Sequence, residues 1–136
     1  MNKTKLKVLL VDDDTIYQYI ASKTLDATGL TQKIITCSNG EEAYRFLEKN
    51  MNNPQELPDV ILLDVNMPIM NGWDFLHAFK NLHAPSLKDI PIFLVTSSVN
   101  DADINYAQQF SNVQDYIVKP LVKEKLSTIL SSVCVS

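Results

Sequence analysis

The chain has 136 residues, of which 46% are hydrophobic and 21% are charged, and its formal net charge is −4. These values fit one globular domain that is large enough to bury a core. The acidic balance argues against unaided nucleic-acid binding, and no apolar run approaches the roughly 20 residues that a membrane-spanning helix needs. Cys37 and Cys134 are too few and too isolated for a disulfide framework or a zinc site. The start of the chain has no signal-peptide apolar region, so we expect a cytoplasmic protein without membrane contact.

Strand-like and helix-like segments alternate five times along the chain. In chain order, short runs rich in Val, Ile and Leu predict strands at 5–11, 33–37, 59–64, 91–96 and 115–118. Amphipathic segments between and after them predict helices at 14–28, 38–50, 73–79, 100–110 and 121–133.

The boundaries of these segments carry their own signals. Asp14-Thr15 can open the first helix, and Gly29 is a usual stop signal. The third helix is broken at 83–86, and Pro91 stands where a strand can begin without a backbone donor. The pattern predicts an α/β fold: a flavodoxin-like (βα)5 doubly wound sheet of five parallel strands, with helices on both faces and right-handed crossovers. We expect a single domain over residues 1–136, with no output domain.

The central strand, 59–64, is an unbroken apolar run that ends in the carboxylate of Asp64. Such a run is typical of a strand covered on both faces, and in open α/β sheets the chemistry lies beyond the carboxyl ends of the strands. Asp64 is at that place. The loop that follows is expected to be stiffened by Pro68 and turned by Asn71-Gly72.

Three other predicted strands also end in polar groups. Asp12 and Asp13 follow the first strand, Thr96 ends the fourth, and Lys119 follows the fifth. If the strands are parallel neighbours, these groups converge with Asp64 at one edge of the sheet. An acidic cluster of this kind favours Mg²⁺, which needs one or two carboxylates and keeps several waters. Metal, ammonium and hydroxyl together could neutralise a phosphoryl group during its transfer to a carboxylate.

At these residues the sequence resembles the receiver domain of two-component response regulators, of the stand-alone type. The matching motifs are Val11-Asp12-Asp13, Leu63 to Pro68 with Asn71-Gly72, Val95-Thr96-Ser97, and Tyr116 to Pro120. Their order and spacing fit over nearly the whole chain. The sequence departs from the family pattern at Ser97, Asn112-Val113 and Leu121, but none of these departures removes a chemical group.

The resemblance implies a role for each matching residue. Asp64 would be the phosphoacceptor, and Thr96 and Lys119 would contact the phosphoryl group. The metal ligands would be Asp13, Asp64, the backbone carbonyl of Asn66 and, through water, Asp12. Thr96 and Tyr116 would form the switch, and the phosphodonor would contact Ile16, Ile20 and Pro68.

Several of these residues have a second interpretation. Asp12 and Asp13 could simply cap the first helix, although Asp14 or Thr15 can do that. Tyr116 could be a core residue, and Ile16 and Ile20 could pack against the sheet.

The resemblance predicts a phosphorylation-dependent switch rather than a turnover enzyme. Its partners would be a histidine kinase or histidine phosphotransfer protein and an unknown downstream protein, which it would contact through the surface of the fourth helix, fifth strand and fifth helix. We expect a monomer or a weak phosphorylation-dependent dimer. The alternative is a haloacid-dehalogenase-like Mg²⁺-dependent phosphatase that uses Asp12. Ile16 departs from that motif, and the chain has no room for the cap that such enzymes generally carry.

Overall fold

A computed structural model describes residues 4–97 and 100–134. Its centre is one sheet of five parallel strands in the order β2-β1-β3-β4-β5. The strands are β1 (Leu6–Val11), β2 (Thr31–Cys37), β3 (Val60–Asp64), β4 (Ile92–Thr96) and β5 (Val113–Val118). The order reverses between β1 and β3, as in a doubly wound sheet, so the predicted fold class is confirmed.

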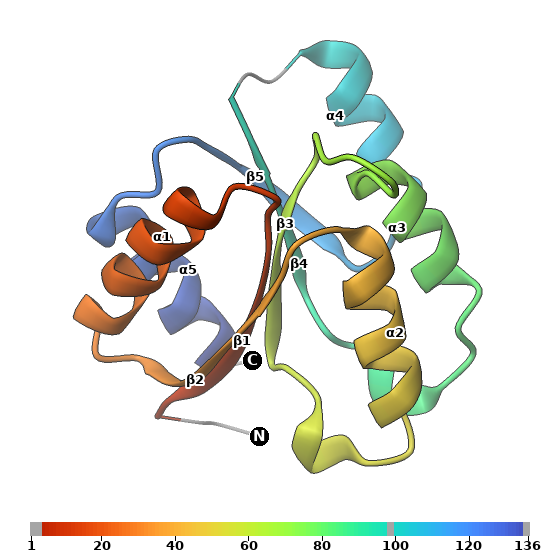
Figure 1. Cartoon of the computed structure of the whole chain (residues 1–136), viewed down its shortest axis with the longest axis horizontal. Helices are drawn as coiled ribbons and strands as arrows, with labels where there is room; N and C mark the ends of the chain where they lie inside the picture. Colours follow the sequence, from red (N-terminus) through yellow and green to blue (C-terminus); the bar gives the residue numbers. More distant parts are fainter. Residues whose placement is uncertain (1–3, 98–99, 135–136) are drawn as a thin grey trace.

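Helices cover both faces of this sheet (Figure 1). The α-helices are α1 (Thr15–Ala27), α2 (Gly40–Asn50), α3 (Gly72–Lys80), α4 (Asp101–Ala107) and α5 (Lys123–Cys134). Figure 1 shows α1 and α5 together on one side of the sheet and α2 and α3 on the other, with α4 beside α3. No helix within the described residues is long and apolar enough to cross a lipid bilayer.

The predicted element boundaries need small corrections at the edges of the sheet. β2 begins two residues before the predicted strand, and β5 likewise begins at Val113 rather than at residue 115. Both are edge strands with several exposed side chains, so their apolar pattern understates their length. α4 ends at Ala107, earlier than predicted, and two one-turn helices, η1 (Pro54–Glu56) and η2 (Pro85–Leu87), lie in the predicted loops.

The side chains of the strands alternate between two buried clusters. Leu9 and Leu63 belong to the cluster under α2, α3 and α4, whereas Leu10 and Leu62 belong to the cluster under α1 and α5. This alternation follows from strand geometry, in which successive side chains point to opposite faces. β1, β3 and β4 are buried at nearly every position, as parallel strands covered on both faces should be.

Candidate functional site

Three carboxylates lie together at the carboxyl edge of the sheet. Asp12 and Asp13 follow β1, and Asp64 ends the neighbouring β3. One ligand oxygen from each residue lies within 4.8 Å of the others. Asp12 and Asp64 are only 1% and 5% exposed, whereas Asp13 is open to solvent. The structure thus brings together the acidic groups that the sequence predicts to converge.

Lys119 supplies the positive charge of this cluster. Its Nζ lies 3.2 Å from Asp12 Oδ2 and 3.5 Å from Asp64 Oδ2. Its backbone N–H donates to the carbonyl of Thr96 at 2.8 Å, which keeps the end of β5 beside the end of β4. The ammonium therefore lies between the two buried carboxylates.

Burial and charge shift the titration of these groups. Desolvation raises the pKa of Asp64 to about 6, with a further upward contribution from Asp12, and Lys119 opposes both. Desolvation also acts to lower the pKa of Lys119, but the carboxylates of Asp64 and Asp12 outweigh it, so that pKa is raised. The buried cluster therefore favours any additional cation that can reach it.

The ring of Tyr17 is a component of the site that the sequence analysis missed. Lys119 Nζ lies 4.2 Å from the centre of this ring, within the range of a cation–π interaction. The phenol oxygen of Tyr17 is buried, with no hydrogen-bond partner in the described part of the chain. Desolvation raises the pKa of this phenol. Tyr17 is on α1, and no motif of the sequence marks it, since an aromatic residue on an amphipathic helix is usually a core residue.

Asp14 is the N-cap of α1, as predicted. Its Oδ1 accepts hydrogen bonds from the backbone N–H groups of Ile16 and Tyr17, each at 3.0 Å. Asp12 instead accepts from the backbone of Asp14 at 3.0 Å and pairs with Lys119. Capping of α1 therefore does not require the carboxylates of Asp12 and Asp13.

The loop after Asp64 is held by tight backbone contacts. The N–H of Met70 donates to the carbonyl of Pro68 at 2.7 Å, and Ile69 between them has φ of +67°. A β-branched residue with a positive φ is strained. A hydrogen bond from a backbone N–H to the carbonyl two residues earlier is that of a γ-turn. Ile69 is 78% exposed. The loop that follows Asp64 thus presents an apolar side chain to solvent.

Asn71-Gly72 does not form the turn that the sequence suggests. Asn71 is instead the N-cap of α3 and forms a capping box with Asp74. A Cβ at Gly72 would lie 2.8 Å from the carbonyl oxygen of Asp64, so glycine allows the helix to start directly against the end of β3.

Thr96 and Tyr116 lie on the face of the sheet opposite to that of Asp64. By strand alternation Thr96 shares the face of Leu94, and Tyr116 packs against the same cluster under α4. Thr96 is buried on the strand next to Asp64, while Tyr116 is half-buried. The hydroxyl of Tyr116 donates to the carbonyl of Asp103 in α4 at 2.5 Å. Tyr116 therefore connects β5 to α4.

We expect Tyr116→Phe to lose about 1 kcal/mol of stability, because it removes this hydrogen bond and keeps the ring. Phosphoryl uptake should stay near the wild-type rate, since the hydroxyl bonds to α4 rather than to the acidic cluster. The measurement is the change in backbone NMR shifts across α4 when Tyr116→Phe, Tyr116→Ala and the wild type are phosphorylated. A full wild-type change in Tyr116→Ala would make Tyr116 a core residue only.

The residues predicted to meet the phosphodonor are on the surface. Ile16 and Ile20 on α1 are 73% and 55% exposed, and Pro68 is also exposed. The alternative prediction that the two isoleucines pack against the sheet is wrong, because α1 buries Ala21 and Leu25 instead. The predicted contact residues leave apolar side chains exposed on α1 and on the loop after β3.

The donor set suits a hard divalent cation. Asp12, Asp13 and Asp64 offer carboxylate oxygens close together, and the exposed side of Asp13 leaves room for coordinated waters. Asn66 follows directly in the loop, and its N–H donates to Asp64 Oδ1 at 3.2 Å. The residues present therefore fit Mg²⁺, which would add a second positive charge to this acidic cluster.

Comparison with known proteins now identifies the family. Residues 8–131 match the response regulator receiver domain, and the chain belongs to this family. The chemotaxis protein CheY1 of Helicobacter pylori is 33% identical over 132 residues, which cover 93% of this chain and 98% of that protein. A CheY homologue of Campylobacter jejuni is 34% identical, with 93% and 94% covered.

Solved structures agree with this assignment. A two-component response regulator from Cytophaga hutchinsonii superposes with a TM-score of 0.86 at 28% identity, covering 97% of this chain and 99% of that one. The chemotaxis protein CheY4 of Vibrio cholerae gives 0.77 at 28% identity, covering 95% and 98%. A sensor-kinase receiver domain from Pseudomonas aeruginosa, with magnesium in its active-site cleft, shares the fold with a TM-score of 0.77 at 22% identity over 97% and 99%.

This protein is therefore a phosphorylation-dependent signalling receiver of the CheY type. Receiver domains act as signalling switches. The haloacid-dehalogenase alternative receives no support, and Asp12, its proposed nucleophile, is held by Lys119 and by the start of α1.

Proposed function

We propose that Asp64 accepts a phosphoryl group from a phosphohistidine. A carboxylate oxygen of Asp64 would attack phosphorus, forming an O–P bond as the N–P bond of the donor breaks. The electron pair of that bond returns to the imidazole nitrogen of the donor. The observation that carries this proposal is the cluster of Asp12, Asp13, Asp64 and Lys119 at the carboxyl edge of the sheet, in which Asp12 and Asp64 are buried.

The neighbouring groups would share the charge that arrives with the phosphoryl group. Asp13 and Asp64, the carbonyl of Asn66 and, through water, Asp12 would hold Mg²⁺, which neutralises phosphoryl oxygens when bound. Lys119 would move from its carboxylate partners to one phosphoryl oxygen, and the Thr96 hydroxyl would donate to another. Tyr17 would keep the Lys119 ammonium over its ring and so limit the positions that Lys119 can reach.

The donor would be a histidine kinase or a histidine phosphotransfer protein that docks on Ile16, Ile20 and Pro68. Their exposure beside the acidic cluster supports this docking face. A receiver that meets such a donor works in the cytoplasm. The chain would modify and demodify itself at Asp64 and would not turn over external substrates.

The output would pass through α4, β5 and α5. Phosphorylation would draw Thr96 toward the phosphoryl group, and Tyr116 would exchange its contact with Asp103 for a more buried position. Partner preference would then change as a shift between two populations. Exposed Ile104 and Val122 supply apolar contact area on this surface.

The test of the acceptor is chemical phosphorylation. Acetyl phosphate with Mg²⁺ should add one phosphoryl group to the unmodified protein. Peptide mass spectrometry should place that group on the peptide that contains Asp64, and base should release it, as expected for an acyl phosphate. A phosphoryl group on Asp12 or Asp13 instead would refute the assignment.

Asp13→Ala should lose Mg²⁺ binding and phosphorylation without loss of thermal stability. Asp13 is exposed and makes no hydrogen bond or ion pair within the described residues, so its removal relieves like-charge repulsion at no structural cost. Titration calorimetry with Mg²⁺ and a thermal melt measure the two effects. Asp14→Ala is the matched control, since it removes the cap of α1 and should cost about 1 kcal/mol while Mg²⁺ affinity stays. A destabilised Asp13→Ala with unchanged Mg²⁺ affinity would contradict the metal role.

A further inference from the structure

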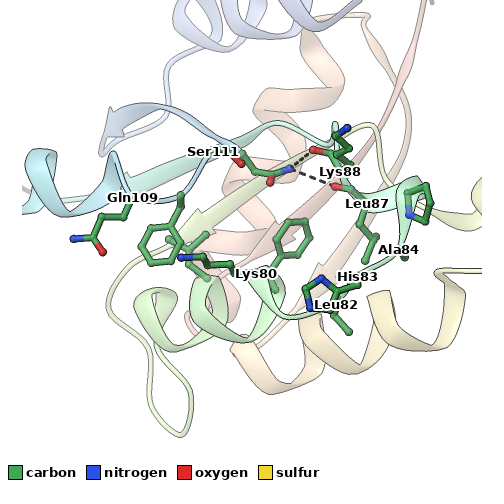
Figure 2. A pocket seen from close by; sticks show the side chains of 13 residues that line it. Lys80, Leu82, His83, Ala84, Leu87, Lys88, Gln109 and Ser111 are labelled. Carbon is green, nitrogen blue, oxygen red and sulfur yellow. Dashed lines mark hydrogen bonds between the residues drawn. The ribbon is translucent and has the colours of Figure 1, made fainter.

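A hollow of about 490 Å³ lies at the end of the sheet opposite Asp64. Its walls are the end of α3, the η2 loop that precedes β4, and the segment 109–112 that precedes β5 (Figure 2). Because the strands are parallel, their amino ends are at the edge away from the acidic cluster. The volume is within the range of small-molecule sites. None of its lining residues takes part in the proposed phosphoryl transfer.

The interior of the hollow is apolar and its frame is fixed. Leu76, Phe79 and Phe110 line it and are themselves largely buried. The side-chain amide of Asn112 donates to the carbonyls of Leu87, Lys88 and Ile90 at 3.3, 3.1 and 2.7 Å, which joins the two loops that form one wall. Figure 2 marks two of these hydrogen bonds.

Two lysines and several other polar side chains surround the hollow. Lys80 comes from α3 and Lys88 from the end of η2, and neither forms an ion pair with any described residue. No acidic side chain is among the lining residues, although the chain as a whole has a net charge of −4. Gln109 and Ser111 add an amide and a hydroxyl (Figure 2). Two of the wall carbonyls, those of Leu87 and Lys88, already accept hydrogen bonds from Asn112.

We infer that this hollow binds a small organic anion with an apolar body and one acidic group. The apolar body would fill the space between Leu76, Phe79 and Phe110, and the acidic group would lie near Lys80 or Lys88.

The hollow is also connected to α4. The Phe110 ring lies 5.7 Å from that of Tyr106, and Tyr106 in turn lies 4.9 Å from Trp73. His77 on α3 hydrogen-bonds the Tyr106 hydroxyl. A bound anion would therefore favour one position of α4. Phosphorylation would then change the affinity of the protein for the anion, by the same factor as the bound anion changes the phosphorylation equilibrium. This coupling rests on the proposed function, whereas binding itself does not.

The probe is anilinonaphthalene sulfonate, an aromatic amphiphilic anion, with neutral N-phenylnaphthylamine as the uncharged comparison. NMR titration of the folded, unphosphorylated protein should shift amides of α3, η2 and 109–112. Lys80→Gln with Lys88→Gln should weaken binding of the sulfonate about tenfold and leave the neutral probe unchanged. Lys33→Gln with Lys125→Gln makes the same change of charge at exposed sites on β2 and α5 and should have no effect.

Ala84→Trp should block both probes, because it places a large ring in the hollow, and its melting temperature checks that the variant is folded. Shifts centred on Ile16 and Ile20, or equal weakening by the two lysine pairs, would overturn the inference. Binding should persist in Asp64→Asn, which separates this site from phosphoryl transfer. Equal affinity of the phosphorylated and unphosphorylated wild type would overturn the coupling alone.

Discussion

Replacing Asp64 with asparagine should abolish phosphorylation and also raise the free energy of unfolding at neutral pH. Asparagine keeps the shape of the side chain but has no nucleophilic carboxylate. It also removes a buried charge whose pKa in the folded protein is about 6 against an ordinary 3.8. At pH 7 the ionised form costs the folded state roughly 3 kcal/mol, which the variant should regain. Phosphoryl uptake from acetyl phosphate and denaturant unfolding in a chelator measure the two effects.

The gain in stability should depend on pH in a definite direction. Because the pKa of Asp64 is raised on folding, the folded protein binds more protons than the unfolded chain between pH 3.8 and about 6. Wild-type stability therefore falls, relative to the variant, as the pH rises through this window. The two proteins should differ little at pH 3.8 and below, and most above pH 6. A difference that is constant from pH 4 to pH 7 would show that Asp64 is not desolvated as the structure indicates.

Lys119→Met should destabilise the protein by roughly 2 kcal/mol at pH 7 without Mg²⁺, because Asp12 and Asp64 lose their positive partner while they remain buried. The loss should shrink in acid, where the carboxylates take up protons. Added Mg²⁺ should restore part of the stability, since it would bind more tightly without the competing ammonium. Phosphorylation should become slower but persist, while the NMR response of α4 to phosphorylation should be lost.

Lys119→Arg is the matched variant for this prediction. It keeps the positive charge and the contact with the Tyr17 ring, so its stability without Mg²⁺ should be near that of the wild type. Its planar group cannot reproduce the position of the ammonium, so the α4 response should still be weakened. Equal stability of Lys119→Met and the wild type in chelator would mean that Lys119 does not neutralise the carboxylates.

The fold class and the groups that meet at the sheet edge could be predicted from the sequence alone. Continuous apolar runs such as 60–63 are typical of a strand covered on both faces, and parallel neighbours bring their carboxyl ends to one edge. The prediction that Asp12, Asp13, Asp64 and Lys119 converge needed no more than this. Helix caps such as Asp14 were equally predictable, because they depend on residues two or three positions apart.

The division of these groups between the two faces of the sheet depends on long-range packing and could not be predicted from local sequence. Lys119 and Asp12 are 107 positions apart, and their contact depends on the register of four strands. That register and strand alternation place Asp12, Asp64 and Lys119 toward α1 and α5, and Thr96 and Tyr116 toward α4. The Tyr17 ring reaches Lys119, and Ile16 and Ile20 face solvent, because of the way α1 is rotated on the sheet. Helix rotation is set by packing between elements distant in sequence, and local spacing does not specify it.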